Sequence, residues 1–458
     1  MSKIYILLLI LLSGIIFYSC EKEDDKTTFD NPHKEKLITS LNQELHALPN
    51  DPLDWKEKDL KFLDSQADKS IIGLGEANHG SADFFNAKAQ IFKYLVKNHG
   101  YKVFAIEADF GESLILNRII QSGADSYITT AMNKYMFFWT WKTQEVRNLL
   151  KWMCQYNKGK SEEEKVHYVG IDCQLNELNT DELNHYLQNA NISFASFADS
   201  LMDEAKKATG NNFSSYNDTS FKKYLEKLSA LNDSMENSKT KLIQNSSEKE
   251  YKLYKRTLEI IEQTSKYRVQ ENDYDFRDSC MAENATWLID QYNDKIALWA
   301  HNGHISKMST YYGFSGYTMG KHIDNKIGDE YGTIGFAFSK GSFNAVDNES
   351  KKLITHTINS DPIENTLTDY FSMAKAKTFT ISISELTNHN SWETEFLNPT
   401  KYLAIGAKYN SNPKNFYRPI EKYHFDRLIY FDKISESNFL WNTKKGEISS
   451  SQPNAKNF

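Results

Sequence analysis

Apolar runs of strand length recur along the chain, separated by longer and more polar stretches. Between the first of these runs, apolar residues recur at helical spacing, as at Phe84, Phe85, Ala89, Phe92, Leu95 and Val96. Strand-like runs that alternate with amphipathic helices predict a mixed α/β fold with a mostly parallel central sheet and flanking helices. The runs are, in chain order, SIIGLG, KVFAIEAD, VHYVGID, KIALWA, YGTIGFAFS, KTFTISIS, KYLAIGAKY and RLIYFD.

The stretch from about 176 to 292 has a different composition. It is rich in Lys, Glu, Asn, Leu and Ser, and Gly210 is its one glycine between Gln174 and Tyr292. Long helical periodicity with few chain-breaking residues predicts a helical lobe inserted between two strands of the sheet. A coiled-coil interaction arm is the alternative that this pattern leaves open.

Residues 1–20 form a separate unit, in which one lysine precedes an apolar run that ends at Ser19-Cys20. This layout is typical of a signal peptide and is short for a membrane span. It resembles a bacterial lipoprotein signal, in which Cys20 becomes the lipidated first residue; an uncleaved anchor is the alternative. We therefore expect an exported protein attached to a membrane, at the bacterial outer membrane or cell surface. Residues 21–35 are then a polar tether, residues 36–435 the folded domain and residues 436–458 a flexible tail.

Charge and cysteine usage narrow the set of partners. The formal net charge is −7 and no long basic run occurs, which argues against a nucleic-acid partner. Apart from Cys20, the chain contains Cys154, Cys173 and Cys280, without the spacing of a zinc site. We expect these three cysteines to be buried free thiols. The sequence gives no indication of the oligomeric state.

Ionisable side chains collect where the predicted strands end. Glu76 and His79 follow SIIGLG, and Glu107 lies at the end of KVFAIEAD. His301 and His304 follow KIALWA. Each residue alone could be a helix cap, a salt bridge or a surface group. Because the carboxyl ends of parallel strands meet at one edge of the sheet, their coincidence predicts a single shared site.

The residues of this predicted site suit hydrolysis. No nucleophile motif is evident, since GFSGY around Ser315 lacks the final glycine of a G-x-S-x-G elbow. Imidazoles beside carboxylates suit general-base activation of water. The same residues could hold a metal ion that activates water. Both readings lead to hydrolysis.

Several of these motifs occur in the same order in a known family. GLGEANHG, HGYKVFAIEADF, FWTWKTQEVRNLLKWM, YVGIDCQ, RDSCMAENATWL and WAHNGHI resemble the erythromycin esterase family over roughly residues 60–430. The resemblance implies a small-molecule ester substrate, which in members with the known activity is a macrolide lactone opened as a means of antibiotic resistance. It also implies attack by activated water, with no covalent serine intermediate and no cofactor. A metal-dependent hydrolase using the same residues, or a non-catalytic small-molecule binding protein on this scaffold, is the alternative.

The resemblance gives the predicted site residues separate roles. His79 corresponds to the general base that takes a proton from the attacking water, and Glu76 would orient the water or the imidazole. Glu107 corresponds to a further carboxylate of the site. His301 and His304 correspond to paired histidines that polarise the carbonyl or protonate the leaving alkoxide.

Two positive side chains and one aromatic stretch complete the expectations. Lys88 stands where the family more often has arginine, and we assign it, with Arg277, to substrate binding. Asn78 replaces a commoner threonine or serine, which leaves the choice of substrate open. The aromatic stretch YMFFWTW, residues 135–141, is typical of core packing, but part of it could form an apolar wall for a bulky ligand.

Overall fold

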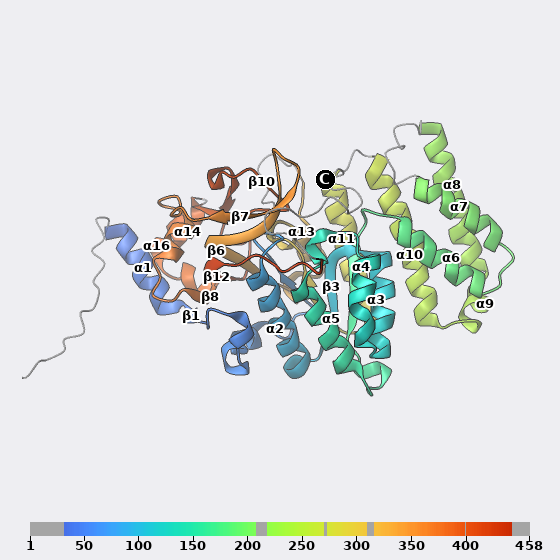
Figure 1. The fold of residues 1–458 in the computed structure, drawn as a ribbon, viewed down its shortest axis with the longest axis horizontal. Helices are drawn as coiled ribbons and strands as arrows, with labels where there is room; N and C mark the ends of the chain where they lie inside the picture. The colour runs from blue at the N-terminus through green and yellow to red at the C-terminus, as the bar shows by residue number, and fades with distance from the viewer. Residues whose placement is uncertain (1–31, 208–217, 270–272, 309–315, 399, 442–458) are drawn as a thin grey trace, which may run out of the picture.

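The computed structural model describes residues 32–207, 218–269, 273–308, 316–398 and 400–441. Figure 1 shows a central sheet with helices around it and a group of helices that extends from one end. The predicted mixed α/β fold is confirmed. The signal segment, Cys20 and most of the predicted tail lie outside the described residues. Among the helices of the described part, none has the length and apolar character that a membrane span needs.

Parallel strands form the centre of the sheet. The order is β1-β8-β12-β6-β2-β5-β3-β4, and the run from β12 to β4 is parallel throughout. At one edge, β8 is antiparallel to both of its neighbours, β12 and β1. The second half of the long β6 also pairs with β7 and β10. A separate pair joins β9 and β11. The bounds are β1 His46–Ala47, β2 Ile71–Leu74, β3 Tyr101–Asp109, β4 His167–Asp172, β5 Lys295–Trp299, β6 Tyr331–Asp347, β7 Leu353–Ile358, β8 Thr378–Ser382, β9 Thr400–Leu403, β10 Lys408–Tyr409, β11 Tyr417–Ile420 and β12 Arg427–Ile434.

Helices cover both faces of this sheet and also form the lobe. Successive strand residues point to opposite faces, so Ile71 and Ile72 belong to two different apolar layers. Phe85 of α2 and Leu149 of α5 belong to the layer of Ile72, whereas Met281 of α11 belongs to the layer of Ile71. The bounds are α1 Pro32–Glu44, α2 Ala82–His99, α3 Phe110–Ser122, α4 Ile128–Tyr135, α5 Gln144–Asn157, α6 Glu177–Asn189, α7 Ala195–Lys207, α8 Asp218–Asn237, α9 Lys239–Gln244, α10 Glu248–Val269, α11 Tyr274–Tyr292, α12 Asn302–Ile305, α13 Met319–Ile327, α14 Leu367–Ser372, α15 Ile383–Thr387 and α16 Asn390–Leu397.

The inserted lobe lies between β4 and β5 in the chain, where the sequence predicted it. Helices α6 to α10 stand together at one end of the molecule in Figure 1. Helix α11 then returns to the sheet, because its buried face packs beside β4 and β5. The lobe therefore leaves and re-enters the sheet next to the strand ends that carry the predicted site residues.

One predicted strand is divided in the structure. The run KYLAIGAKY forms β9 and β10, and residues 404–407 between them are not part of a strand. Their backbone groups bind elsewhere: the Ile405 N–H donates to the Ala77 carbonyl (2.5 Å), and the Ala404 N–H donates to the Phe416 carbonyl (3.0 Å). The Ala407 carbonyl accepts from the Val346 N–H (2.9 Å). The bond to Ala77 holds the interruption against the loop that contains Glu76 and His79.

The chain after β12 crosses two other loops. Residues 436–441, the described part of the predicted tail, are hydrogen-bonded to the body of the protein instead of being detached from it. The Ser437 N–H donates to the Gly80 carbonyl (2.9 Å), and the Gln144 N–H donates to the Asn438 carbonyl (2.6 Å). Asn344 also donates from its side chain to the Ser437 carbonyl (2.7 Å). The segment 435–441 thus joins the loop after β2 to the start of α5.

Candidate active site

The predicted site residues come together at the carboxyl edge of the sheet. In the strand register, Leu74 at the end of β2 pairs with Trp299 at the end of β5, and Trp299 pairs with Ile106 of β3. The residues that follow these positions are therefore neighbours. The Asn302 N–H donates to the Glu76 carbonyl (2.9 Å), and the His301 N–H donates to a Glu107 carboxylate oxygen (3.0 Å).

His79 and Glu76 form a hydrogen-bonded pair. His79 Nδ1 lies 2.7 Å from Glu76 Oε1, so the Nδ1 proton points to the carboxylate and the Nε2 lone pair stays available. The second carboxylate oxygen of Glu76 accepts from the Trp299 indole N–H (2.8 Å) and from the Lys88 ammonium. Burial raises the pKa of Glu76, but Lys88 and His79 outweigh it and hold that pKa below its usual value. Glu76 is thus a carboxylate that fixes the tautomer and orientation of His79.

Lys88 lies beneath this pair and does not line the cavity that a ligand would enter. Its side chain is fully buried, and its ammonium lies over the Trp299 ring, 4.0 Å from the centroid. Burial lowers the pKa of Lys88 to about 8, and the opposing attraction of Glu76 limits the shift. The structure therefore places Lys88 as a support for Glu76 and not, as the sequence suggested, at the substrate.

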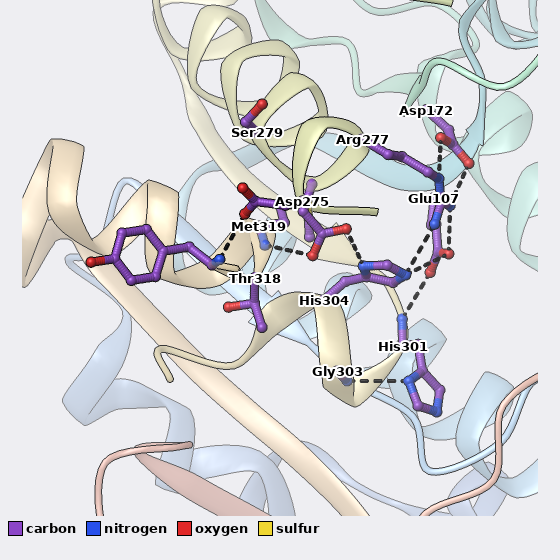
Figure 2. A network of polar contacts seen from close by, with 12 residues as sticks. Glu107, Asp172, Asp275, Arg277, Ser279, His301, Gly303, His304, Thr318 and Met319 are labelled. Carbon is purple, nitrogen blue, oxygen red and sulfur yellow. Dashed lines mark hydrogen bonds and ion pairs between the residues drawn. The ribbon is translucent and has the colours of Figure 1, made fainter. Parts of the chain in front are cut away.

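A second group of charges surrounds Glu107, as Figure 2 shows. Arg277, in the first turn of α11, binds Asp172 through Nε (2.9 Å) and Nη2 (2.6 Å), and Nη2 also donates to Glu107 Oε1 (3.0 Å). His304 Nε2 lies 3.2 Å from the same Glu107 oxygen, and its Nδ1 lies 2.7 Å from Asp278 Oδ1. Strands β3 and β4, helix α11 and helix α12 thus each contribute to one buried ionic network.

These contacts shift the pKa values in opposite directions. Burial disfavours a charged imidazole, but the Asp278 and Glu107 carboxylates raise the pKa of His304 to about 10. Burial likewise raises the pKa of Glu107, but His304 and Arg277 hold it well below its usual range. His304 is therefore an imidazolium near neutral pH, with one ring nitrogen within ion-pair distance of each carboxylate.

We expect the stability that His304 contributes to fall as the pH rises. Its folded pKa of about 10 lies above the reference value of 6.5, so the folded state retains a proton that the unfolded state has lost. The contribution is complete below about pH 6.5 and declines towards about pH 10 by at most about 1.4 kcal/mol per pH unit. Urea unfolding of the wild type and His304→Gln across this window measures the difference. It should shrink as the pH rises.

His424 provides the matched control for this prediction. Burial lowers its pKa to about 4, so His424 is neutral in both folded and unfolded states above about pH 6.5. The wild type and His424→Gln should therefore differ by a constant amount across the window. A constant difference for His304→Gln as well would contradict the assignment of the imidazolium.

His301 stands beside His79 but has both ring nitrogens engaged. Its Nδ1 accepts from the Gly303 N–H (3.1 Å), and its Nε2 lies 3.2 Å from the Ile405 carbonyl, to which it donates. Burial lowers the pKa of His301 to about 3, and nearby His79 acts in the same direction. The ring is therefore neutral, and it lies 5.0 Å from the His79 ring as part of the cavity wall.

A cavity of about 400 Å³ opens above these groups. Of the predicted residues, His79, Glu107, Arg277, His301 and His304 line it. The aromatic stretch has both of the roles proposed for it: Trp141 is buried with its N–H on the Glu107 carbonyl (2.9 Å), and Phe138 and Trp139 also line the cavity. The remaining lining residues include Gln174, Tyr267, Arg268, Tyr274, Gly406, Ala407 and Lys408.

The residues present do not fit a metal ion. The ring nitrogens of His301 and His304 are occupied by the backbone and by carboxylates, as described above. That leaves His79 Nε2 as the available imidazole lone pair among the predicted ligands. No group of three or more His, Cys, Asp or Glu side chains in the described ranges has a metal-binding arrangement.

Sequence reasoning missed several residues that complete the site. Asp278 contacts His304, and Trp299 donates to Glu76, yet neither was among the predicted site residues. Asp172, which was not among them either, is the main partner of Arg277. The signal for Lys88 was in its position: it lies on the same helix face as Phe84 and Phe92, which marks it as buried.

The three cysteines of the domain are buried free thiols, as expected. Cys173 directly follows Asp172, and Cys280 lies one turn after Arg277 on α11. Burial and their mutual contact raise the pKa of Cys173 well above its usual value, so it is not a thiolate nucleophile. The site is therefore composed of imidazoles, carboxylates and a guanidinium.

Comparison with known proteins identifies the family of this chain. A family model described as erythromycin esterase matches residues 96–434. YbfO of Bacillus subtilis (strain 168), which is named as a candidate hydrolase, is 25% identical over 360 residues, covering 70% of this chain and 77% of that protein. The erythromycin esterase type II of Escherichia coli is 23% identical over 304 residues, covering 60% of this chain and 70% of that protein.

Solved structures share the fold. A Bacillus cereus protein has a TM-score of 0.77 and 24% identity, covering 89% of this chain and 99% of that chain. The erythromycin esterase EreC, a mutant in an open conformation, has a TM-score of 0.63 and 16% identity, covering 87% of this chain and 99% of that chain. Because the family model spans most of the sequence, this protein belongs to the erythromycin esterase family.

Proposed function

We propose that this protein is a hydrolase that cleaves an ester by attack of a water molecule activated by His79. One observation carries the proposal: His79 Nδ1 is held by the buried Glu76, and the ring lines a cavity that Arg277 and His304 also line. A base and fixed positive charge in one cavity are the groups that acyl transfer to water requires.

In the proposed reaction His79 carries a proton in both directions. Nε2 takes a proton from water as the water oxygen bonds to the ester carbonyl carbon, which gives a tetrahedral oxyanion and an imidazolium. Glu76 stabilises this imidazolium through its 2.7 Å contact with Nδ1. The carbon–oxygen bond to the alcohol then breaks, and the departing alkoxide takes the proton from Nε2. Acid and alcohol leave, and His79 is neutral again.

Arg277 is the proposed donor to the oxyanion. Nε and Nη2 are committed to Asp172 and Glu107, whereas Nη1 has no carboxylate within hydrogen-bonding distance in the described residues. Nη1 lies 3.2 Å from His304 Nε2, a contact that engages one of its two N–H groups. The other N–H of Nη1 is the one we propose to donate to a substrate oxygen, which is worth about 10²–10³-fold in rate for one oxyanion donor.

The two later histidines then differ from the roles that the resemblance implied. His304 acts as fixed positive charge beside the oxyanion, because its pKa of about 10 makes it a poor proton donor near neutral pH. His301 is neutral and bonded to the backbone, so it shapes the wall beside His79. Proton transfer therefore falls to His79 alone.

The substrate class follows from the wall of the cavity. A space of about 400 Å³ lies in the range of small-molecule pockets, and Phe138, Trp139 and Tyr274 offer apolar surface. An ester with an apolar or aromatic portion fits this lining. Erythromycin belongs among the compounds to test, because the names of two similar proteins refer to it.

Turnover of a panel of esters by the purified full chain tests the proposal. Aryl esters, alkyl esters, a lactone and erythromycin are incubated with the protein, and the acid product is followed by pH-stat titration and mass spectrometry. We expect hydrolysis of at least one class, unaffected by a metal chelator or by an organophosphate that labels catalytic serines. Tight binding of these compounds without any acid product would contradict the hydrolase and favour a binding protein on the same scaffold.

A further inference from the structure

Two cavities share residues at the interruption between β9 and β10. The main cavity of about 400 Å³ is lined by His79, and a second cavity has a volume of about 90 Å³. His301 and Gly406 line both. His301 donates a hydrogen bond to the Ile405 carbonyl, next to Gly406. Tyr402, Ala404 and Phe416 line the second cavity only.

Gly406, which is partly exposed, has free space where a side chain would lie. A Cβ atom placed on Gly406 would meet no atom within 4 Å, so the missing side chain corresponds to open space. The backbone there does not require glycine, because Gly406 is not among the residues with positive φ. A glycine that is needed neither for a left-handed conformation nor for close packing points to a requirement for space.

We propose that Gly406 determines substrate size, by letting a short acyl chain of the ester pass from the main cavity into the second cavity. This inference rests on the proposed hydrolase and specifies its substrate class as esters of short-chain acids. The second cavity, about 90 Å³, holds about three non-hydrogen atoms if each occupies about the volume of one water. A butyryl chain fills this space, and an octanoyl chain exceeds it.

The acyl half of the ester, rather than the alcohol half, points to the second cavity. The departing alcohol oxygen takes its proton from His79, and His79 lines the main cavity but not the second one. The alcohol half therefore stays in the main cavity, next to Trp139 and Phe138. The chain on the other side of the carbonyl carbon then extends past His301 and Gly406.

Acyl-length selectivity of the wild type and Gly406→Leu tests the proposal. With 4-nitrophenyl esters, burial of each methylene should raise kcat/KM by about fourfold, so that butyrate exceeds acetate by about fifteenfold. Octanoate should lose this advantage. In Gly406→Leu the ratio of butyrate to acetate should fall to near one, and in Gly406→Ala it should be intermediate. An unchanged ratio in both variants, with wild-type melting temperatures, would overturn the proposal.

Ala407→Leu is the matched control, because Ala407 lines the main cavity but not the second one. It should alter kcat/KM for all chain lengths by a similar factor. A second readout does not depend on catalysis: binding of 4-nitrophenyl alkyl ketones of the same lengths, followed by quenching of tryptophan fluorescence. The wild type should bind the propyl ketone more tightly than the methyl ketone, and Gly406→Leu should remove this difference.

The two readouts separate failure of this proposal from failure of the proposed function. If no ester is hydrolysed but ketone binding follows chain length as described, the hydrolase is wrong and the size-selecting role of Gly406 holds. If esters are hydrolysed but neither kcat/KM nor binding responds to Gly406→Leu, the hydrolase holds and the second cavity does not receive the acyl chain.

Discussion

Replacing His79 by alanine is expected to lower kcat for ester hydrolysis by about 10²–10⁴-fold, the usual range for a lost general base. The reason is geometric. Among the predicted residues, His79 offers the one available imidazole lone pair, and its ring lines the cavity. Glu76 Oε1 holds the ring through Nδ1, at 2.7 Å. The fold should be retained, because His79 lies in a loop and Glu76 keeps Lys88 and Trp299 as hydrogen-bond partners. Steady-state kinetics with the best ester of the panel measures the effect.

His99→Ala is the matched control for this prediction. His99 also contacts a carboxylate, Asp64, at 2.9 Å, but it lies at the opposite end of α2 from the site. This variant should keep wild-type kcat. Glu76→Gln should reduce kcat in His79-containing protein but have little further effect in His79→Ala, because Glu76 acts through His79. Near wild-type turnover by His79→Ala would falsify the base assignment.

Replacing Lys88 by methionine is expected to destabilise the protein by about 3–5 kcal/mol, the usual cost of removing one partner of a buried ion pair. Both Lys88 and Glu76 are fully buried, so the Glu76 carboxylate loses its nearest compensating charge without gaining water. The pKa of Glu76 should rise, and a neutral Glu76 would no longer stabilise the His79 imidazolium. Urea unfolding gives the loss of stability, and kcat at neutral pH gives the loss of activity.

Lys93→Met is the control on the same helix. Lys93 is partly buried over the Trp152 ring and has no carboxylate partner within the described ranges, so its replacement should change stability little. The double variant Lys88→Met/Glu76→Gln should recover part of the stability, since neither charge then remains unpaired. It should not recover activity. If Lys88→Met were as stable as Lys93→Met, the buried Lys88–Glu76 pair would contribute nothing measurable to the free energy of unfolding.

The sequence predicted the sheet and the location of the site because these depend on local patterns. Apolar runs of strand length identified β2, β3, β4 and β5, and the residues that follow them depend only on where each strand ends. In a parallel sheet those ends meet at one edge, so the sequence alone predicts that Glu76, Glu107 and His301 are neighbours. Patterning of this kind requires no knowledge of long-range contacts.

The remaining parts of the site depend on contacts that a single sequence does not specify. The run KYLAIGAKY has the pattern of one strand, yet it breaks because Ala77 and Phe416 accept its backbone N–H groups in place of a neighbouring strand. Asp278 approaches His304 only when α11 packs beside β5. These arrangements follow from tertiary packing, which overrides local propensity.

The segment 435–441 is synthesised after the parts of the chain to which it binds, so its hydrogen bonds form late. Gly80 beside His79 and Gln144 at the start of α5 emerge early from the ribosome, and their partners Ser437 and Asn438 emerge near the end. A nascent chain that stops after β12 has the strands of the sheet but lacks the hydrogen bonds that join these two segments. The hydrolytic site is therefore completed only after the last part of the domain has been made, so an incomplete chain would bind and turn over substrate poorly.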